Sequence, residues 1–212
     1  MSTTMDSEQF KTIDMSLFCD HNGGMDTFKD QVRQVAEEAP EEHFFVEFGS
    51  YRGGSALTLL DVIRQTKPER WLLTVDPYGA KPFLVGKELR PEFVYSEDIY
   101  RDMTYNLSGF SSAYNLNHAH YRVTSNDFMT IFDSMKFWYK GSVMEPKIAC
   151  IYIDGEHTGE QVDKEITWAK KHMEKGGLII LDDVTLILGE YPEVLDTVRH
   201  GFQDNFRCFR KI

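Results

Sequence analysis

The sequence predicts an α/β protein with a doubly wound, Rossmann-like, mostly parallel sheet of six or seven strands and helices on both faces. Short apolar runs alternate along the chain with longer segments of helical periodicity, as repeated βαβ units require. A glycine-rich turn joins the first apolar run to the helix after it, which is where such sheets bind nucleotides. Acidic residues follow several of the other runs. Because the C-terminal ends of parallel strands share one edge, we expect a ligand site there.

The first elements begin in an N-terminal region, residues 1–43, with a helix predicted over Met25–Ala39 and ended by Pro40. The sequence leaves open whether this helix packs beside the sheet or forms a flap over the site. Three elements follow it: a strand at Phe44–Phe48, a helix at Ser55–Thr66 and a strand at Trp71–Pro77.

The connection from residue 78 to residue 118 is long and rich in aromatic side chains. One helix is predicted within it, over Ser96–Leu107, with Ser96 as its cap. Connections of this length are uncommon between two strands, so we expect a lid or a substrate-binding insertion. The alternative is that its aromatic residues only pack the segment onto the domain.

The second half of the chain continues the alternation. The run Ile148–Ile153 is continuously apolar, which is typical of a strand buried on both faces. We expect all of residues 1–212 to form one domain. The other predicted elements are a strand at His120–Thr124, a helix that is capped by Ser125-Asn126-Asp127 and runs through Phe137, a helix at Gly159–Lys175 stopped by Gly176-Gly177, a strand at Leu178–Leu181, a helix over 192–202 and an edge strand at Phe206–Ile212.

The glycine-rich turn has the sequence Glu-Phe-Gly-Ser-Tyr-Arg-Gly-Gly-Ser. Glycine lets the backbone turn sharply and a ligand approach closely, and the helix start offers unpaired N–H groups. A carboxylate at the strand end would repel a pyrophosphate but attract an amine or a sulfonium, which favours S-adenosylmethionine over NAD. The alternative is a tight turn without a ligand. The expected cofactor-binding residues of the turn are Glu47, Gly49, Ser50, Gly53 and Ser55.

Asp76 ends the second apolar run, about 20 to 30 residues beyond the glycine turn, at the spacing of a ribose-binding acid. We expect it to accept hydrogen bonds from a ribose diol. The alternative is a solvated loop aspartate ahead of the Pro-Tyr-Gly turn.

Three carboxylates are expected to converge at neighbouring strand ends: Asp154 after one strand, and Asp182 with Asp183 after the next. Their repulsion would be relieved by a cation, and an all-oxygen set selects Mg²⁺, or Mn²⁺, over zinc. The alternative for the Asp-Asp pair is a helix cap. His157 follows Asp154 by three residues, so we expect it to be the catalytic base beside the acids, although a lone loop histidine is often a surface residue.

The composition argues against several partners. The 212-residue chain has a net charge of -11, which opposes binding to nucleic acid or anionic lipid. Its three cysteines have no metal-ligand spacing and suit reduced thiols. No signal-peptide segment or membrane-length apolar run is visible, so we expect a cytoplasmic protein. The oligomeric state stays open, a homo-oligomer included.

Four blocks in order carry a resemblance: Val-Glu-Phe-Gly-Ser-Tyr-Arg-Gly-Gly-Ser, Thr-Val-Asp-Pro, Tyr-Ile-Asp-Gly-Glu-His-Thr and Lys-Gly-Gly-Leu-Ile-Ile-Leu-Asp-Asp. Together they resemble the class I S-adenosylmethionine-dependent methyltransferases, in particular the metal-dependent macrocin O-methyltransferase-like branch. The resemblance implies that the first block binds the cofactor's methionine part. It further implies these roles: Asp76 for ribose, Ser125 for adenine, Asp154, Asp182 and Asp183 for Mg²⁺, and His157 as base.

The leading hypothesis is therefore a metal-dependent O-methyltransferase that acts on a small-molecule hydroxyl, and the resemblance points to a sugar or glycan. A metal-dependent nucleotide-sugar glycosyltransferase is the alternative from another enzyme class, since paired aspartates with a divalent ion also bind diphosphates. A non-catalytic nucleotide-binding protein is the third hypothesis. The tail after Asp183 is short for the helix and paired strands of the family, so the sheet could lack one strand.

Overall fold

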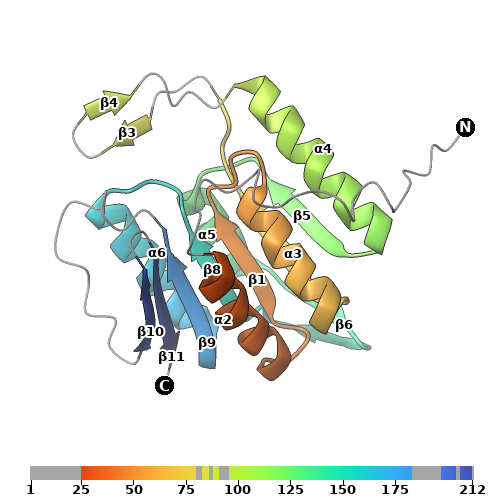
Figure 1. The fold of residues 1–212 in the computed structure, drawn as a ribbon. Helices are drawn as coiled ribbons and strands as arrows, with labels where there is room; N and C mark the ends of the chain where they lie inside the picture. The colour runs from red at the N-terminus through yellow and green to blue at the C-terminus, as the bar shows by residue number, and fades with distance from the viewer. Residues whose placement is uncertain are drawn as a thin grey trace, which may run out of the picture.

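Seven strands form one mixed sheet in the computed structural model, which describes residues 25–79, 83–85, 88–90, 96–182, 197–203 and 206–211. The strand order is β10-β11-β9-β8-β1-β2-β5 (Figure 1). Neighbours from β9 to β5 are parallel, whereas β11 runs antiparallel to β9 and β10 antiparallel to β11. The strands are β1 (Phe44–Phe48), β2 (Trp71–Val75), β5 (Asn117–Tyr121), β8 (Ile148–Ile153), β9 (Met173–Leu181), β10 (Thr197–Gln203) and β11 (Phe206–Lys211).

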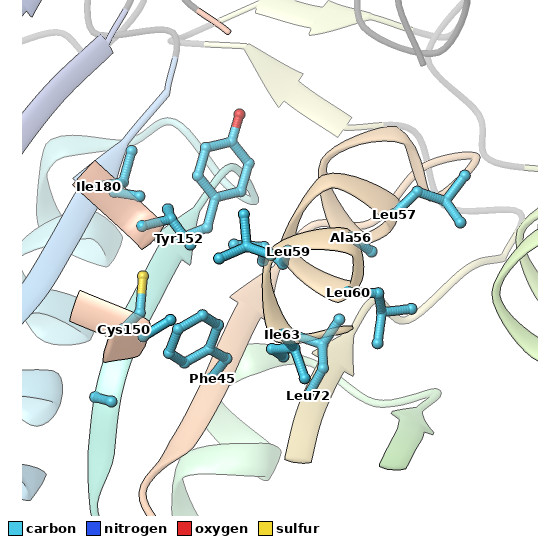
Figure 2. Close-up of a cluster of buried hydrophobic side chains, with 14 of the residues drawn as sticks. Phe45, Ala56, Leu57, Leu59, Leu60, Ile63, Leu72, Cys150, Tyr152 and Ile180 are labelled. Carbon is cyan, nitrogen blue, oxygen red and sulfur yellow. The ribbon is translucent and has the colours of Figure 1, made fainter. Parts of the chain in front are cut away.

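Helices cover both faces of the sheet, which confirms the predicted fold class. Alternate strand residues point to opposite faces, so Phe45 packs in one apolar cluster and Val46 in the other. Figure 2 shows the first cluster, in which Phe45, Leu72 and Cys150 of three strands meet the apolar side chains of α3. The helices on this face are α2 (Met25–Glu38), α3 (Gly54–Thr66) and α4 (Glu97–Tyr114); those on the other face are α5 (Ser125–Ser134) and α6 (Gly159–His172).

Helix α4 occupies the second half of the segment 78–118 that was predicted to be a lid or insertion. It is the crossover helix between the parallel strands β2 and β5, and it buries Met103, Leu107 and Phe110 against the core. Ser96 caps it as predicted, by accepting from the Ile99 amide. The first half of the segment contains a short antiparallel pair of strands, β3 (Phe83–Val85) and β4 (Glu88–Arg90). Some other residues of this half lie outside the part of the chain that the structure describes.

The C-terminal end differs from its prediction. Residues 197–203, part of the segment expected to be a helix over 192–202, form β10 instead. The expected edge strand is β11, but β10 pairs with its outer side and takes the edge position. Both strands of the terminal pair are therefore present, and the expectation that the sheet could lack one is wrong.

Several helix and strand boundaries also differ from the predicted ones. The third parallel strand lies at Asn117–Tyr121 and not at His120–Thr124, while α5 stops at Ser134 because a β6–β7 hairpin (Phe137–Tyr139 and Ser142–Met144) follows it. Helix α6 stops at His172, and the predicted stop Gly176-Gly177 lies inside β9. Within the described part of the chain, no helix is long and apolar enough to cross a membrane.

Candidate functional site

The turn between β1 and α3 depends on glycine at two positions. Gly49 has φ +83°, and a Cβ there would lie 1.9 Å from the Asp154 carbonyl oxygen. Gly53 has φ +87° and is the residue before α3, where a Cβ would lie 3.1 Å from the Leu107 side chain. Side chains other than hydrogen are strained at such angles. The glycines thus let the turn pass close to the end of β8 and to α4.

Asp76 holds this turn in place from the end of β2. One carboxylate oxygen accepts from the amides of Ser50 (3.0 Å) and Tyr51 (3.2 Å), and the other accepts from the Tyr78 amide (3.0 Å). The side chain is buried, and burial raises its pKa while these three amides lower it. The structure therefore gives Asp76 a role in shaping the turn, which the sequence alone did not indicate. The predicted bond to a ribose stays a prediction.

Glu47 lies at the centre of the predicted binding turn, fully buried on β1. Its Oε1 accepts from the Ser55 hydroxyl at 2.6 Å, whereas its Oε2 is buried without a hydrogen-bond partner in the protein, as is the Ser50 hydroxyl. Burial raises the pKa of Glu47 to about 7, against the lowering effect of the Ser55 hydroxyl and of the nearby Ser50 hydroxyl. An orphaned carboxylate oxygen in this position suits a cationic ligand group, which would pair with it.

The predicted acids lie at the ends of the adjacent strands β8 and β9. The Asp154 amide donates to Phe48 (2.8 Å) and the Asp182 amide donates to Ile153 (3.0 Å), so the two backbones leave the sheet at the same edge. The buried Tyr152 hydroxyl donates to an Asp182 oxygen. Figure 2 shows this hydroxyl directed away from the apolar cluster. Burial and then the charges of Asp154 and Asp182 keep the pKa of Tyr152 well above its usual range.

His157 lies beside Asp154, as predicted, with its Nε2 3.8 Å from an Asp154 oxygen and its side chain 15% exposed. Asp183, the third predicted metal ligand, lies outside the described residues. Among the residues that the structure does describe, no group of three or more His, Cys, Asp or Glu side chains could hold a metal ion.

Ser125 lies at the start of α5, on the same sheet edge. Thr124, and not the predicted Ser125-Asn126-Asp127, caps this helix by accepting from the Asp127 amide. The Ser125 hydroxyl donates to Glu165 of α6 at 2.5 Å. Sequence reasoning missed Glu165 because it reads as one more polar residue of an amphipathic helix. Its helical spacing from the apolar residues Val162 and Ala169, three residues before it and four after it, was the available signal.

Residues 46–184 match the family model described as a methyltransferase domain. No curated protein matches the sequence.

Solved structures share the fold at low sequence identity. The calicheamicin methyltransferase CalS11 has a TM-score of 0.63 and 13% identity, covering 97% of this chain and 86% of its own. The O-methyltransferase TomG from Streptomyces achromogenes, in complex with S-adenosylmethionine, has a TM-score of 0.55 and 12% identity, covering 96% and 85%. The O-methyltransferase from Bacillus cereus, in complex with S-adenosylhomocysteine, has a TM-score of 0.55 and 12% identity, covering 100% and 92%.

Proposed function

Because the chain belongs to the methyltransferase-domain family, we propose that it transfers a methyl group from S-adenosylmethionine to a hydroxyl of a small molecule. The observation that carries the proposal is the buried Glu47 oxygen that has no hydrogen-bond partner in the protein, beside a glycine turn that packs closely against the end of β8 and against α4. Diphosphate donors, which the glycosyltransferase alternative needs, would meet this carboxylate unfavourably. The family match gives that alternative and the non-catalytic one no support.

The cofactor is expected to lie across the C-terminal edge of β1, β2 and β5. Glu47 would accept a hydrogen bond from the cationic amino acid part, with the glycine turn and Ser50 alongside it. Asp76, already bound to three amides, still has lone pairs for a ribose hydroxyl, since each carboxylate oxygen accepts about two bonds. The turn at Ser125 is the nearest part of the edge for adenine, because the Asp76 amide donates to Tyr121, shortly before that turn.

The acceptor class proposed is a sugar or glycan hydroxyl. CalS11 is described as a TDP-rhamnose 3'-O-methyltransferase, and other proteins of the same fold are described as O-methyltransferases. These descriptions belong to those proteins and support the proposal by analogy. The macrocin O-methyltransferase-like branch is part of the same proposal.

A divalent ion, Mg²⁺ or Mn²⁺, belongs to the proposal as well. Asp154 and Asp182, which follow the adjacent strands β8 and β9, would be two of its oxygen ligands, and Asp183 follows directly in the sequence. Two carboxylates would supply part of the coordination of such an ion, since a Mg²⁺ site commonly uses one or two carboxylates together with waters and substrate oxygens. When bound, the ion would lower the pKa of an acceptor hydroxyl.

The chain's own residues would perform the remaining chemistry. In the transfer, the acceptor oxygen forms a bond to the methyl carbon while the bond from that carbon to sulfur breaks, which releases S-adenosylhomocysteine. The acceptor's proton goes to His157, which lies within reach of Asp154 at the same edge.

A methyl-transfer assay tests the proposal. S-adenosylmethionine with a labelled methyl group is incubated with the protein and a panel of nucleotide sugars and glycosides, with Mg²⁺ or with excess EDTA. We expect label on an acceptor oxygen, and EDTA should lower the rate at least about 10-fold, as loss of a metal's charge stabilisation would. A control with EDTA and excess Mg²⁺ should restore the rate. Full activity in EDTA would remove the ion from the proposal, and label on no acceptor would count against the sugar class.

A further inference from the structure

A second buried carboxylate, Glu165, lies between α5 and α6. It is 1% exposed, its Oε1 accepts from the Ser125 hydroxyl (2.5 Å) and from Gln161 (2.9 Å), and its Oε2 is buried without a hydrogen-bond partner in the protein. Burial raises the pKa of Glu165 to about 7. A buried acid of this kind costs stability, and an apolar residue would pack against the core without that cost. Its presence therefore calls for a role other than packing.

The hydrogen bonds around Glu165 fix the first two residues of α5 from the side of α6. The Ser125 hydroxyl gives its proton to Glu165 and accepts from the Gln161 amide at 3.0 Å. The Asn126 side-chain amide donates to the Gln161 carbonyl oxygen at 3.1 Å. Each donor in this network faces an acceptor, so a rotated Ser125 or Asn126 side chain would lose its hydrogen bonds. The two side chains are therefore each held in one orientation.

The same network reaches the loop that carries His157. Gln161 stands in the first turn of α6, whose cap is Thr158, the residue directly after His157. The start of α5 and the start of α6 are therefore tied together on the edge where the cofactor is proposed to bind. The network thus connects the proposed adenine side of the site with its proposed catalytic side.

We propose that Glu165 is a positioning residue for the cofactor's adenine: acting through Ser125 and Gln161, it holds the first turn of α5 in the geometry that recognises the base. The inference rests on the proposed function, since adenine is placed here as part of S-adenosylmethionine. Glu165 itself does not contact the base. Its contribution is the fixed direction of the side chains and amides that do.

Three variants test the inference. Glu165→Ala removes both acceptor contacts, Glu165→Gln keeps a carbonyl oxygen for Ser125 and Gln161, and Asp163→Ala is a matched control on the exposed face of the same helix. The affinity for S-adenosylhomocysteine and for S-inosylhomocysteine, which has a carbonyl in place of the adenine amino group, is measured by calorimetry. Ser125→Ala, which removes the group that Glu165 holds, serves if Glu165→Ala does not fold.

We expect Glu165→Ala to weaken S-adenosylhomocysteine binding by about 10-fold, which is the effect of losing one buried hydrogen bond. The variant should also show a smaller preference for adenine over hypoxanthine. Glu165→Gln should keep most of the affinity and the preference, and Asp163→Ala should match the wild type. Hydrogen exchange at residues 122–128 of the unliganded protein should be faster in Glu165→Ala and normal in Glu165→Gln.

Unchanged affinity and base preference in Glu165→Ala would overturn the inference, as would equal losses in the Ala and Gln variants. Failure of the wild type to bind S-adenosylhomocysteine at all would instead overturn the proposed function, and with it the adenine assignment. The exchange measurement separates these cases, because it reports on the hydrogen bonds of Glu165 without any ligand.

Discussion

Replacement of His157 by alanine should lower kcat by about 10²- to 10⁴-fold, the usual contribution of a positioned general base. The imidazole lies 3.8 Å from an Asp154 oxygen, at the strand edge where the acceptor hydroxyl is proposed to lose its proton. Alanine leaves no group there to take the proton, while the glycine turn and Glu47 are untouched. The affinity for S-adenosylhomocysteine should therefore stay close to that of the wild type.

The measurement is the steady-state rate of methyl transfer at saturating cofactor, together with a calorimetric affinity. Glu156→Gln is a suitable control, since Glu156 is an exposed residue of the same loop and its amide replacement can still accept from Thr158. Near-normal turnover in His157→Ala would show that another group receives the proton. Equal losses in both variants would indicate damage to the loop and not loss of a base.

Replacement of Glu47 by glutamine should stabilise the unliganded protein at alkaline pH. Burial raises the pKa of Glu47 from 4.5 to about 7 in the folded state. Well below pH 4.5 the acid is protonated in both the folded and the unfolded chain, so its raised pKa does not lower the free energy of unfolding. Between pH 4.5 and about 7 the unfolded chain gains from ionisation of this acid and the folded chain does not, and above about pH 7 both ionise, so the loss no longer grows. The wild type therefore loses up to about 3 kcal/mol of unfolding free energy across this window.

Glutamine does not ionise, so the variant should escape this loss. Urea denaturation at pH 5 and pH 8 checks the result: the variant should gain on the wild type chiefly at pH 8. Glu69→Gln is the control, because Glu69 is an exposed residue remote from the turn. A difference between Glu47→Gln and wild type that does not change with pH would contradict the account of Glu47 as a buried, orphaned acid.

The strands that are buried on both faces were the easiest elements to predict. β1 and β8 begin and end at the predicted residues, because their apolar runs are bounded by polar or turn-forming residues. β10 was missed for the opposite reason. Its residues, Thr197–Gln203, have no apolar alternation of their own, and pairing with β11 at the sheet edge gives them a strand conformation. Such non-local pairing is not visible in a local sequence pattern.

The site, too, has features that the sequence could predict and features that it could not. Glycine spacing and the acids after strands were enough to place Glu47, Asp76, Asp154 and Asp182 on one edge of the sheet. Spacing does not say which atoms are already in use, so the three amides bound to Asp76 could not be predicted. Glu165 was missed because its importance comes from a contact between two helices, 40 residues apart in the chain.

Calorimetric titration of S-adenosylhomocysteine into the wild type and Glu47→Gln tests the central claim most directly, namely that the turn around Glu47 binds the methyl donor. We expect one site with micromolar affinity in the wild type, and binding at least about 10-fold weaker in the variant because a charge-assisted hydrogen bond is lost. A UDP-sugar titrated as comparison should not compete at this site. Equal affinity in the two proteins, or binding of the UDP-sugar in place of S-adenosylhomocysteine, would contradict the account.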